Sequence, residues 1–121
     1  MTTERRRHPR IKLLAQVSLT RDGQAHVLST LDVSLSGLFV AVDPAGYPDM
    51  VVGSEAEIVL HPTPELAEQG AEKVQARARV ARIETGGVRH AGFGLEITRI
   101  DADNMLRLGS LIKKFTDAAH S

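Results

Sequence analysis

The sequence predicts a mainly β protein, a small closed or nearly closed antiparallel barrel that is followed by one C-terminal helix. Two observations support this fold class. Short runs of alternating apolar and polar residues, separated by turn residues, indicate five to seven strands between about residue 11 and residue 97. After Asp101 the apolar residues instead recur at helical spacing. With 121 residues and no cysteine, the chain is expected to be one domain that buries its core without disulfides.

The first half of the chain predicts strands over residues 11–20, 24–31 and 38–42. In the first of these, the residues expected to face the core are Ile11, Leu13, Ala15, Val17 and Leu19. The turn Arg21-Asp22-Gly23 joins the first two strands as a hairpin. Residues 43–53 are expected to be a loop because Pro44, Gly46 and Pro48 interrupt regular structure.

The second half predicts strands over residues 56–60, 74–83 and 88–97. Residues 63–72 are acidic and rich in Ala, and we expect either a loop or a single helical turn. The outer face of the long strand carries arginines at 77, 79 and 82, which either extend a basic rim or, as we favour, form a solvated face.

The last segment predicts a helix over about residues 101–118, with Asp101 or Asp103 as its N-cap. Its apolar stripe, which we expect to pack on one end of the barrel, is Met105, Leu108, Leu111, Ile112 and Phe115. Gly109 lies inside this helix and costs about 1 kcal/mol relative to Ala.

A polar break, Asp32-x-Ser34-x-x-Gly37, separates the second and third predicted strands. Asp and Ser side chains accept hydrogen bonds from nearby backbone N–H groups, which favours a tight bend. Gly37 allows another group to approach the backbone closely. We therefore expect a corner at the rim of the barrel that exposes a carboxylate, hydroxyls and backbone donors together.

Residues 1–10 are polar and aperiodic, and we interpret them as a flexible basic arm in front of a single domain over residues 11–121. The arm contains Arg5, Arg6, Arg7 and Arg10, of which Arg7 is the most expendable. On its own such a segment is typical of a solvated basic tail. The whole chain has 15 basic and 15 acidic residues, so its net charge is zero and gives no electrostatic footprint for DNA or an anionic membrane.

Taken together, the arginines Arg5-Arg6-x-x-x-Arg10 and the later Asp32-x-Ser34-x-x-Gly37 resemble the two motifs of a PilZ domain. The resemblance covers nearly the whole chain and implies a six-stranded antiparallel barrel with a C-terminal helix. It also implies binding of the second messenger cyclic di-GMP, with Arg5, Arg6, Arg10, Asp32, Ser34 and Gly37 as the ligand-binding residues. Because Arg5 directly precedes the Arg-x-x-x-Arg unit, the resemblance further implies a stacked pair of nucleotides.

These residue types suit that ligand. A guanidinium plane stacks on guanine, and its fork of N–H donors binds phosphate oxygens or guanine O6 and N7. The Asp32 carboxylate can accept hydrogen bonds from the guanine N1–H and N2–H₂ edge or hold an arginine in place, and Ser34 can donate to phosphate or base. Ordering the arm costs about 1–2 kcal/mol per residue, so several charge-assisted hydrogen bonds must offset it.

We therefore expect a stand-alone cytoplasmic cyclic di-GMP receptor that signals through an effector protein, in a process such as motility, biofilm formation or virulence. A PilZ adaptor for motility or pilus assembly that needs no nucleotide is the main alternative, and a nucleic-acid-binding domain is the less favoured one. No nucleophile–base pair, metal-ligand spacing or phosphate-cradling loop is apparent, so we expect no enzymatic activity, no metal and no cofactor. No apolar run is long enough to insert into a membrane.

Overall fold

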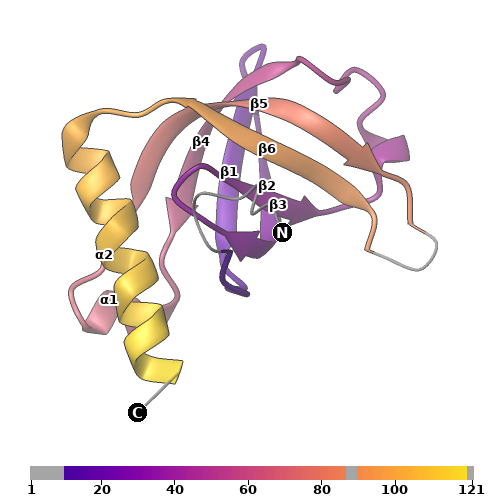
Figure 1. The fold of residues 1–121 in the computed structure, drawn as a ribbon. Helices are drawn as coiled ribbons and strands as arrows, with labels where there is room; N and C mark the ends of the chain where they lie inside the picture. Colours follow the sequence, from indigo (N-terminus) through magenta and orange to yellow (C-terminus); the bar gives the residue numbers. More distant parts are fainter. Residues whose placement is uncertain (1–9, 87–89, 120–121) are drawn as a thin grey trace, which may run out of the picture.

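The computed structural model describes residues 10–86 and 90–119, and shows a closed six-stranded antiparallel barrel with strand order β1-β2-β3-β6-β5-β4 (Figure 1). The strands are β1 (Gln16–Arg21), β2 (Gln24–Val33), β3 (Gly37–Ala41), β4 (Glu55–His61), β5 (Val74–Glu84) and β6 (Gly92–Arg99). The helices are the 3₁₀ turn η1 (Pro44–Gly46), the short α1 (Pro64–Glu68) and the long α2 (Ala102–Ala119). The predicted fold class is confirmed.

The barrel interior is filled by one side of every strand, as the alternating pattern predicted. Among its fully buried side chains are Val17, Leu19, Val40, Val80 and Phe93. The barrel closes where β1 pairs with β4 and β3 pairs with β6, so all six strands have a neighbour on both sides.

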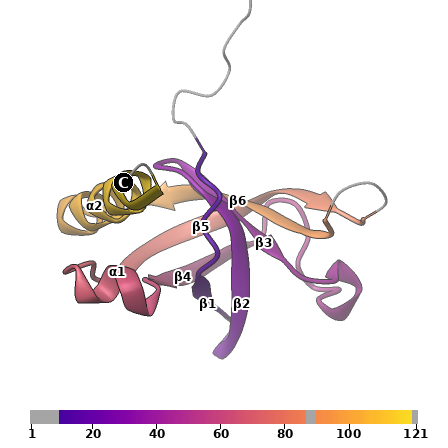
Figure 2. The same cartoon turned by 90° about the horizontal axis from the view of Figure 1, so that it is seen from below.

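Helices α1 and α2 lie at one end of the barrel and η1 lies at the other, as both views of the ribbon show (Figures 1 and 2). Leu108 and Leu111 of α2 are buried against the core. The Asp101 carboxylate caps the helix by accepting from the Asn104 backbone N–H at 2.8 Å. The buried Asn104 side chain in turn accepts from the Gln75 backbone N–H of β5 at 2.8 Å, which fixes the helix to the barrel.

Three predictions about the elements were wrong. Residues 12–15 are not a strand, although Leu13 and Ala15 are buried as expected. Over residues 10–15, pairing with β2 is limited to an isolated bridge between Ile11 and Val33 and one backbone bond from Thr30 N–H to Ala15 O. The last strand begins at Gly92, so residues 90 and 91 of its predicted range are not strand, while residues 88 and 89 lie outside the described residues. Met105 is 37% exposed and lies at the edge of the helix stripe rather than in the core.

Of the two readings left open for residues 63–72, the helical turn is correct. Thr63 caps α1 by accepting from the Leu66 N–H at 3.4 Å, and Leu66 is buried. Within the described residues, no helix is long and apolar enough to cross a membrane.

Candidate ligand-binding site

The candidate site is built on a row of four residues that are paired across four neighbouring strands. Asp32 of β2 pairs with Phe39 of β3, Phe39 pairs with Gly94 of β6, and Gly94 pairs with Arg82 of β5. The row therefore brings together residues from distant parts of the sequence, with a carboxylate at one end and a guanidinium at the other.

Two irregularities in the strand register turn these charged side chains outward. The pairing of β2 with β3 shifts between Thr30 and Asp32, and that of β5 with β6 shifts between Val80 and Arg82. Thr30 and Val80 are buried, so strict alternation would direct residues 32 and 82 inward as well. The extra residue in each strand reverses that phase, which is the usual effect of a β-bulge.

Phe39 forms the floor between the two charges. It is only 6% exposed, yet it lies apart from the cluster that fills the barrel interior. The Arg82 guanidinium covers its ring, with Cζ 5.5 Å from the ring centroid. Gly94 makes room for this arrangement, because a Cβ atom there would lie 2.9 Å from Arg82 Cγ.

A cavity of about 600 Å³ opens above this floor, a size within the usual range for small-molecule sites. Its walls combine apolar, basic and acidic side chains: Lys12, Leu14, Leu31, Asp32, Phe39, Arg82, Glu84 and His90. A second cavity, of about 320 Å³, lies beside the β1–β2 turn and η1, and none of the predicted site residues lines it.

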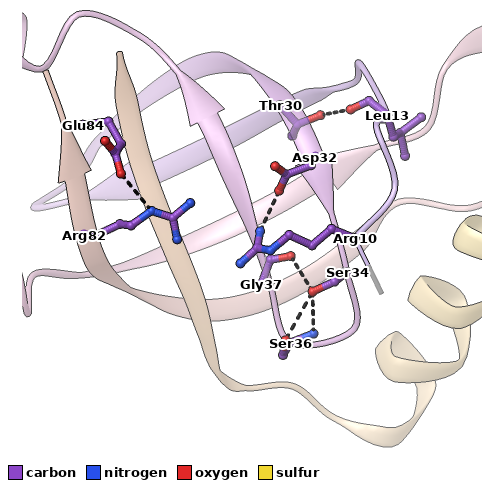
Figure 3. Close-up of polar contacts among 9 residues, drawn as sticks. All are labelled: Arg10, Leu13, Thr30, Asp32, Ser34, Ser36, Gly37, Arg82 and Glu84. Atoms are coloured by element: carbon purple, nitrogen blue, oxygen red, sulfur yellow. Dashed lines mark hydrogen bonds and ion pairs between the residues drawn. The ribbon is translucent and has the colours of Figure 1, made fainter. Parts of the chain in front are cut away.

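Asp32 lines the larger cavity, and Arg10, which does not line it, reaches the rim by pairing with Asp32. Figure 3 shows this pair. Arg10 Nη1 donates to Asp32 Oδ1 at 2.6 Å, and both side chains are largely but not fully covered. The segment that carries Arg10 is tied to β2 by the Ile11–Val33 bridge and by the buried Thr30 hydroxyl. That hydroxyl donates to Leu13 O and accepts from Ala15 N–H. Arg10 is therefore held at the rim by the fold itself.

Ser34 and Gly37 shape the corner and do not line the cavity. Ser34 is 1% exposed, and its hydroxyl accepts from the Ser36 N–H at 3.2 Å and donates to Gly37 O at 3.3 Å. A Cβ atom at Gly37 would lie 2.2 Å from Leu95 O, so only glycine allows β3 to approach β6 here. The expectation that the corner exposes its hydroxyls is wrong for Ser34, because the Ser34 hydroxyl is hydrogen-bonded to other residues of the tight turn.

The structure thus brings Arg10 and Asp32 together, with Ser34 and Gly37 next to them in the corner. Arg5 and Arg6 lie outside the described residues. Sequence reasoning missed Phe39 and Thr30 and assigned Arg82 to a solvated face. One signal for Arg82 was present, since the inward residues of β5 change spacing from two to three between Val80 and Ile83.

The sequence matches the PilZ domain family over residues 4–114. The chain belongs to the PilZ domain family. Domains of this family act as binding or adaptor modules, and cyclic di-GMP is the ligand for which the family is known. A search of curated proteins finds no match.

Solved PilZ structures share the fold at low sequence identity. The PilZ domain of YcgR from Escherichia coli, solved with c-di-GMP, has a TM-score of 0.72 at 13% identity and covers 98% of this chain and 99% of its own. The inhibitor of motility MotI (DgrA) from Bacillus subtilis has a TM-score of 0.72 at 18% identity, over 95% of this chain and 53% of its own. The K. pneumonia MrkH–c-di-GMP complex has a TM-score of 0.73 at 13% identity and covers 98% of this chain and 54% of its own. The chain therefore spans about half the length of MotI and MrkH.

Proposed function

We propose that this PilZ domain is a receptor for cyclic di-GMP that binds the nucleotide in the cavity beside Asp32 and transmits the signal to a protein partner. The observation that carries the proposal is the Arg10–Asp32 pair at the rim of the 600 Å³ cavity. It joins the two sequence motifs in space, and the ligand is a dianion whose guanine edges and phosphates suit a carboxylate and guanidinium groups, respectively.

The proposed binding mode assigns a role to each motif. Asp32 accepts from the N1–H and N2–H₂ edge of one guanine while it holds Arg10 in place. Arg5 and Arg6 close over the ligand and add guanidinium contacts to base and phosphate, since arginine can stack and hydrogen-bond in one plane. Ser34 and Gly37 keep the corner in the shape that presents Asp32. The extra arginine, Arg5, supports a stacked pair of nucleotides.

Signalling then follows when the arm, residues 1–10, closes over the bound ligand. Residues that the ligand orders become a new surface beside the barrel, which a partner protein can distinguish from the free form. The structures of MotI, an inhibitor of motility, and MrkH, a c-di-GMP-dependent transcription regulatory factor, support partner-mediated output in general but do not identify the partner here.

Calorimetric titration of cyclic di-GMP at moderate salt tests this function. We expect saturable binding by the wild type, with a stoichiometry near two nucleotides per chain. Arg10→Ala removes a charge-assisted contact and should raise the Kd about tenfold to hundredfold. Arg107→Ala is the control, because that arginine pairs with Glu72 on the helical end at 3.5 Å and is remote from the cavity in the fold.

A folded wild-type protein that does not bind cyclic di-GMP would contradict the receptor proposal and favour the adaptor that needs no nucleotide. Binding with a stoichiometry near one would retain the receptor and reject the stacked pair. Binding to DNA or RNA that falls steeply as salt is added would indicate a nucleic-acid-binding arm instead.

A further inference from the structure

Arg82 differs from the other arginines on its strand in what surrounds it. Arg77 Nε pairs with Glu55 of the neighbouring strand at 3.0 Å and does not line the cavity. Arg79 pairs with Glu96 and does not line it either. Arg82 does line the cavity, and its nearest carboxylate, Glu84 at 3.2 Å, lines the same cavity.

The guanidinium of Arg82 is held in a fixed orientation. The Phe39 ring lies beneath it, with Arg82 Cζ 5.5 Å from the ring centroid, and Glu84 accepts a hydrogen bond from Arg82 Nε. Gly94 provides the space along its stem, where a Cβ would also lie 3.1 Å from Cζ and from Nη1. Its side chain nevertheless remains 48% exposed, so a ligand can reach it from the cavity.

In Figure 3 the Arg82 side chain extends toward the Arg10–Asp32 pair from the other side of the site. The carboxylate and the guanidinium stand at the two ends of the paired row Asp32–Phe39–Gly94–Arg82. A flat ring can enter the cavity with its hydrogen-bonding edge toward Asp32. The planar guanidinium of Arg82, which lines the same cavity, is then available to its face.

We propose that Arg82 is a ligand-binding residue on whose guanidinium plane a purine base of the bound nucleotide stacks. This inference rests on the proposed function and adds to it a contact outside both sequence motifs. Phe39, the guanidinium and the purine form three stacked layers, and arginine planes are common stacking partners for bases. Because the barrel wall and not the arm carries Arg82, its orientation exists before the ligand arrives and costs little entropy on binding.

The test is a set of calorimetric titrations of cyclic di-GMP into variants whose folding is verified by circular dichroism and thermal unfolding. Arg82→Ala should raise the Kd about tenfold, the size expected for a partly desolvated cation–π contact with a base. Arg82→Lys keeps the charge without the plane and should recover only a small part of that loss. Arg77→Ala, on the same strand with a similarly exposed arginine (45%), should bind as the wild type does.

Gly94→Ala provides a second, independent variant. It leaves Arg82 in the sequence but pushes its stem aside, because the new Cβ overlaps the space of Cγ, Cζ and Nη1. We expect a Kd raised severalfold with the net charge unchanged.

The outcomes separate this inference from the proposed function. If the wild type binds and Arg82→Ala binds equally well, the role of Arg82 is rejected while the receptor stands. If Arg82→Lys restores full affinity, the charge alone acts and stacking is rejected. If Gly94→Ala binds as the wild type does while Arg82→Ala does not, the fixed orientation is rejected. A folded wild type without affinity overturns both proposals.

Discussion

The barrel has a regular side and an irregular side, and similar residues behave differently on the two. On the regular side β1 pairs with β2 and β4, and β4 pairs with β5, without a break in register. Its outward arginine Arg77 lies between two glutamates of β4, Glu55 and Glu57. On the irregular side the bulges in β2 and β5 direct Asp32 and Arg82 to one cavity.

The difference lies in what the charged residues face: Asp32 and Arg82, each next to a bulge, line the cavity, whereas Arg77, although it also lies at a register shift between β5 and β6, pairs with glutamates of β4. On a regular antiparallel face opposite charges meet across strands and satisfy one another. A bulge breaks that sequence of partners and re-aims a side chain. Here two bulges flank the β3–β6 pair, so the charges they redirect lie on either side of Phe39.

The largest effect is expected for Gly37→Ala, which attacks the corner of the irregular side. The added Cβ meets Leu95 O, a backbone atom that cannot move without separating β3 from β6. We expect a loss of about 3 kcal/mol in the free energy of unfolding, measured in urea.

Gly109→Ala is the matched control in α2, where a Cβ would have no neighbour within 4 Å. It should stabilise the protein by about 1 kcal/mol, because alanine favours the helix. Equal stability of Gly37→Ala and the wild type would show that the corner is not tightly packed against β6.

A smaller effect is expected for Thr30→Val, which keeps the shape of the side chain and removes its hydroxyl. Two buried backbone groups, Ala15 N–H and Leu13 O, then lose their partner, at a cost of about 1–3 kcal/mol in stability. Because the same bonds hold the segment that presents Arg10, we also expect weaker binding of cyclic di-GMP in the calorimeter.

Thr20→Val tests the same substitution on the regular side. Thr20 is exposed on β1, and the change there should stay within about 0.5 kcal/mol. If the two threonine variants lose equal stability, the buried Thr30 hydroxyl has no special part in holding the segment that carries Arg10.

The sequence was sufficient for the barrel, for the terminal helix and for most inward residues, because burial imposes a period of two on strands and of 3.6 on helices. It was misleading over residues 12–15, where Leu13 and Ala15 are buried as in a strand but Leu13 O and Ala15 N–H bond the Thr30 side chain. Only Ala15 O, which accepts from the Thr30 N–H at 2.8 Å, makes a backbone bond to β2 among these groups. Alternation reports which residues are buried and not which backbone groups pair.

The candidate site was predictable only in part for a related reason. The resemblance of two motifs pointed to Arg10 and Asp32, and the structure shows them in contact. The position of Arg82 opposite Gly94 depends on pairing between strands that are adjacent in the barrel, and on a bulge that shifts that pairing by one residue. The spacing of the inward residues of β5 carries a trace of that bulge, but the pairing of β3 with β6, which places Phe39 next to Gly94, joins strands that are far apart in the sequence and leaves no such trace.

The smallest effect concerns the helical end, where Asn104 of α2 is bonded to the barrel wall through the Gln75 N–H of β5. Hydrogen bonds from the backbone and side chain of Asn104 lower the pKa of the Asp101 carboxyl below its ordinary value. The unfolded chain therefore binds this proton more readily than the folded one, so the contribution to stability is complete above about pH 4 and disappears as the pH falls through the lowered pKa.

Asp101→Asn still caps the helix but does not titrate. We expect the wild type to be slightly more stable than Asp101→Asn in urea at pH 7, and this difference to vanish at strongly acidic pH. Asp103→Asn removes a charge from the same turn while leaving the Asp101–Asn104 bonds intact, and should change the pH dependence less. A pH-independent difference between the wild type and Asp101→Asn would mean that the cap acts through its geometry alone.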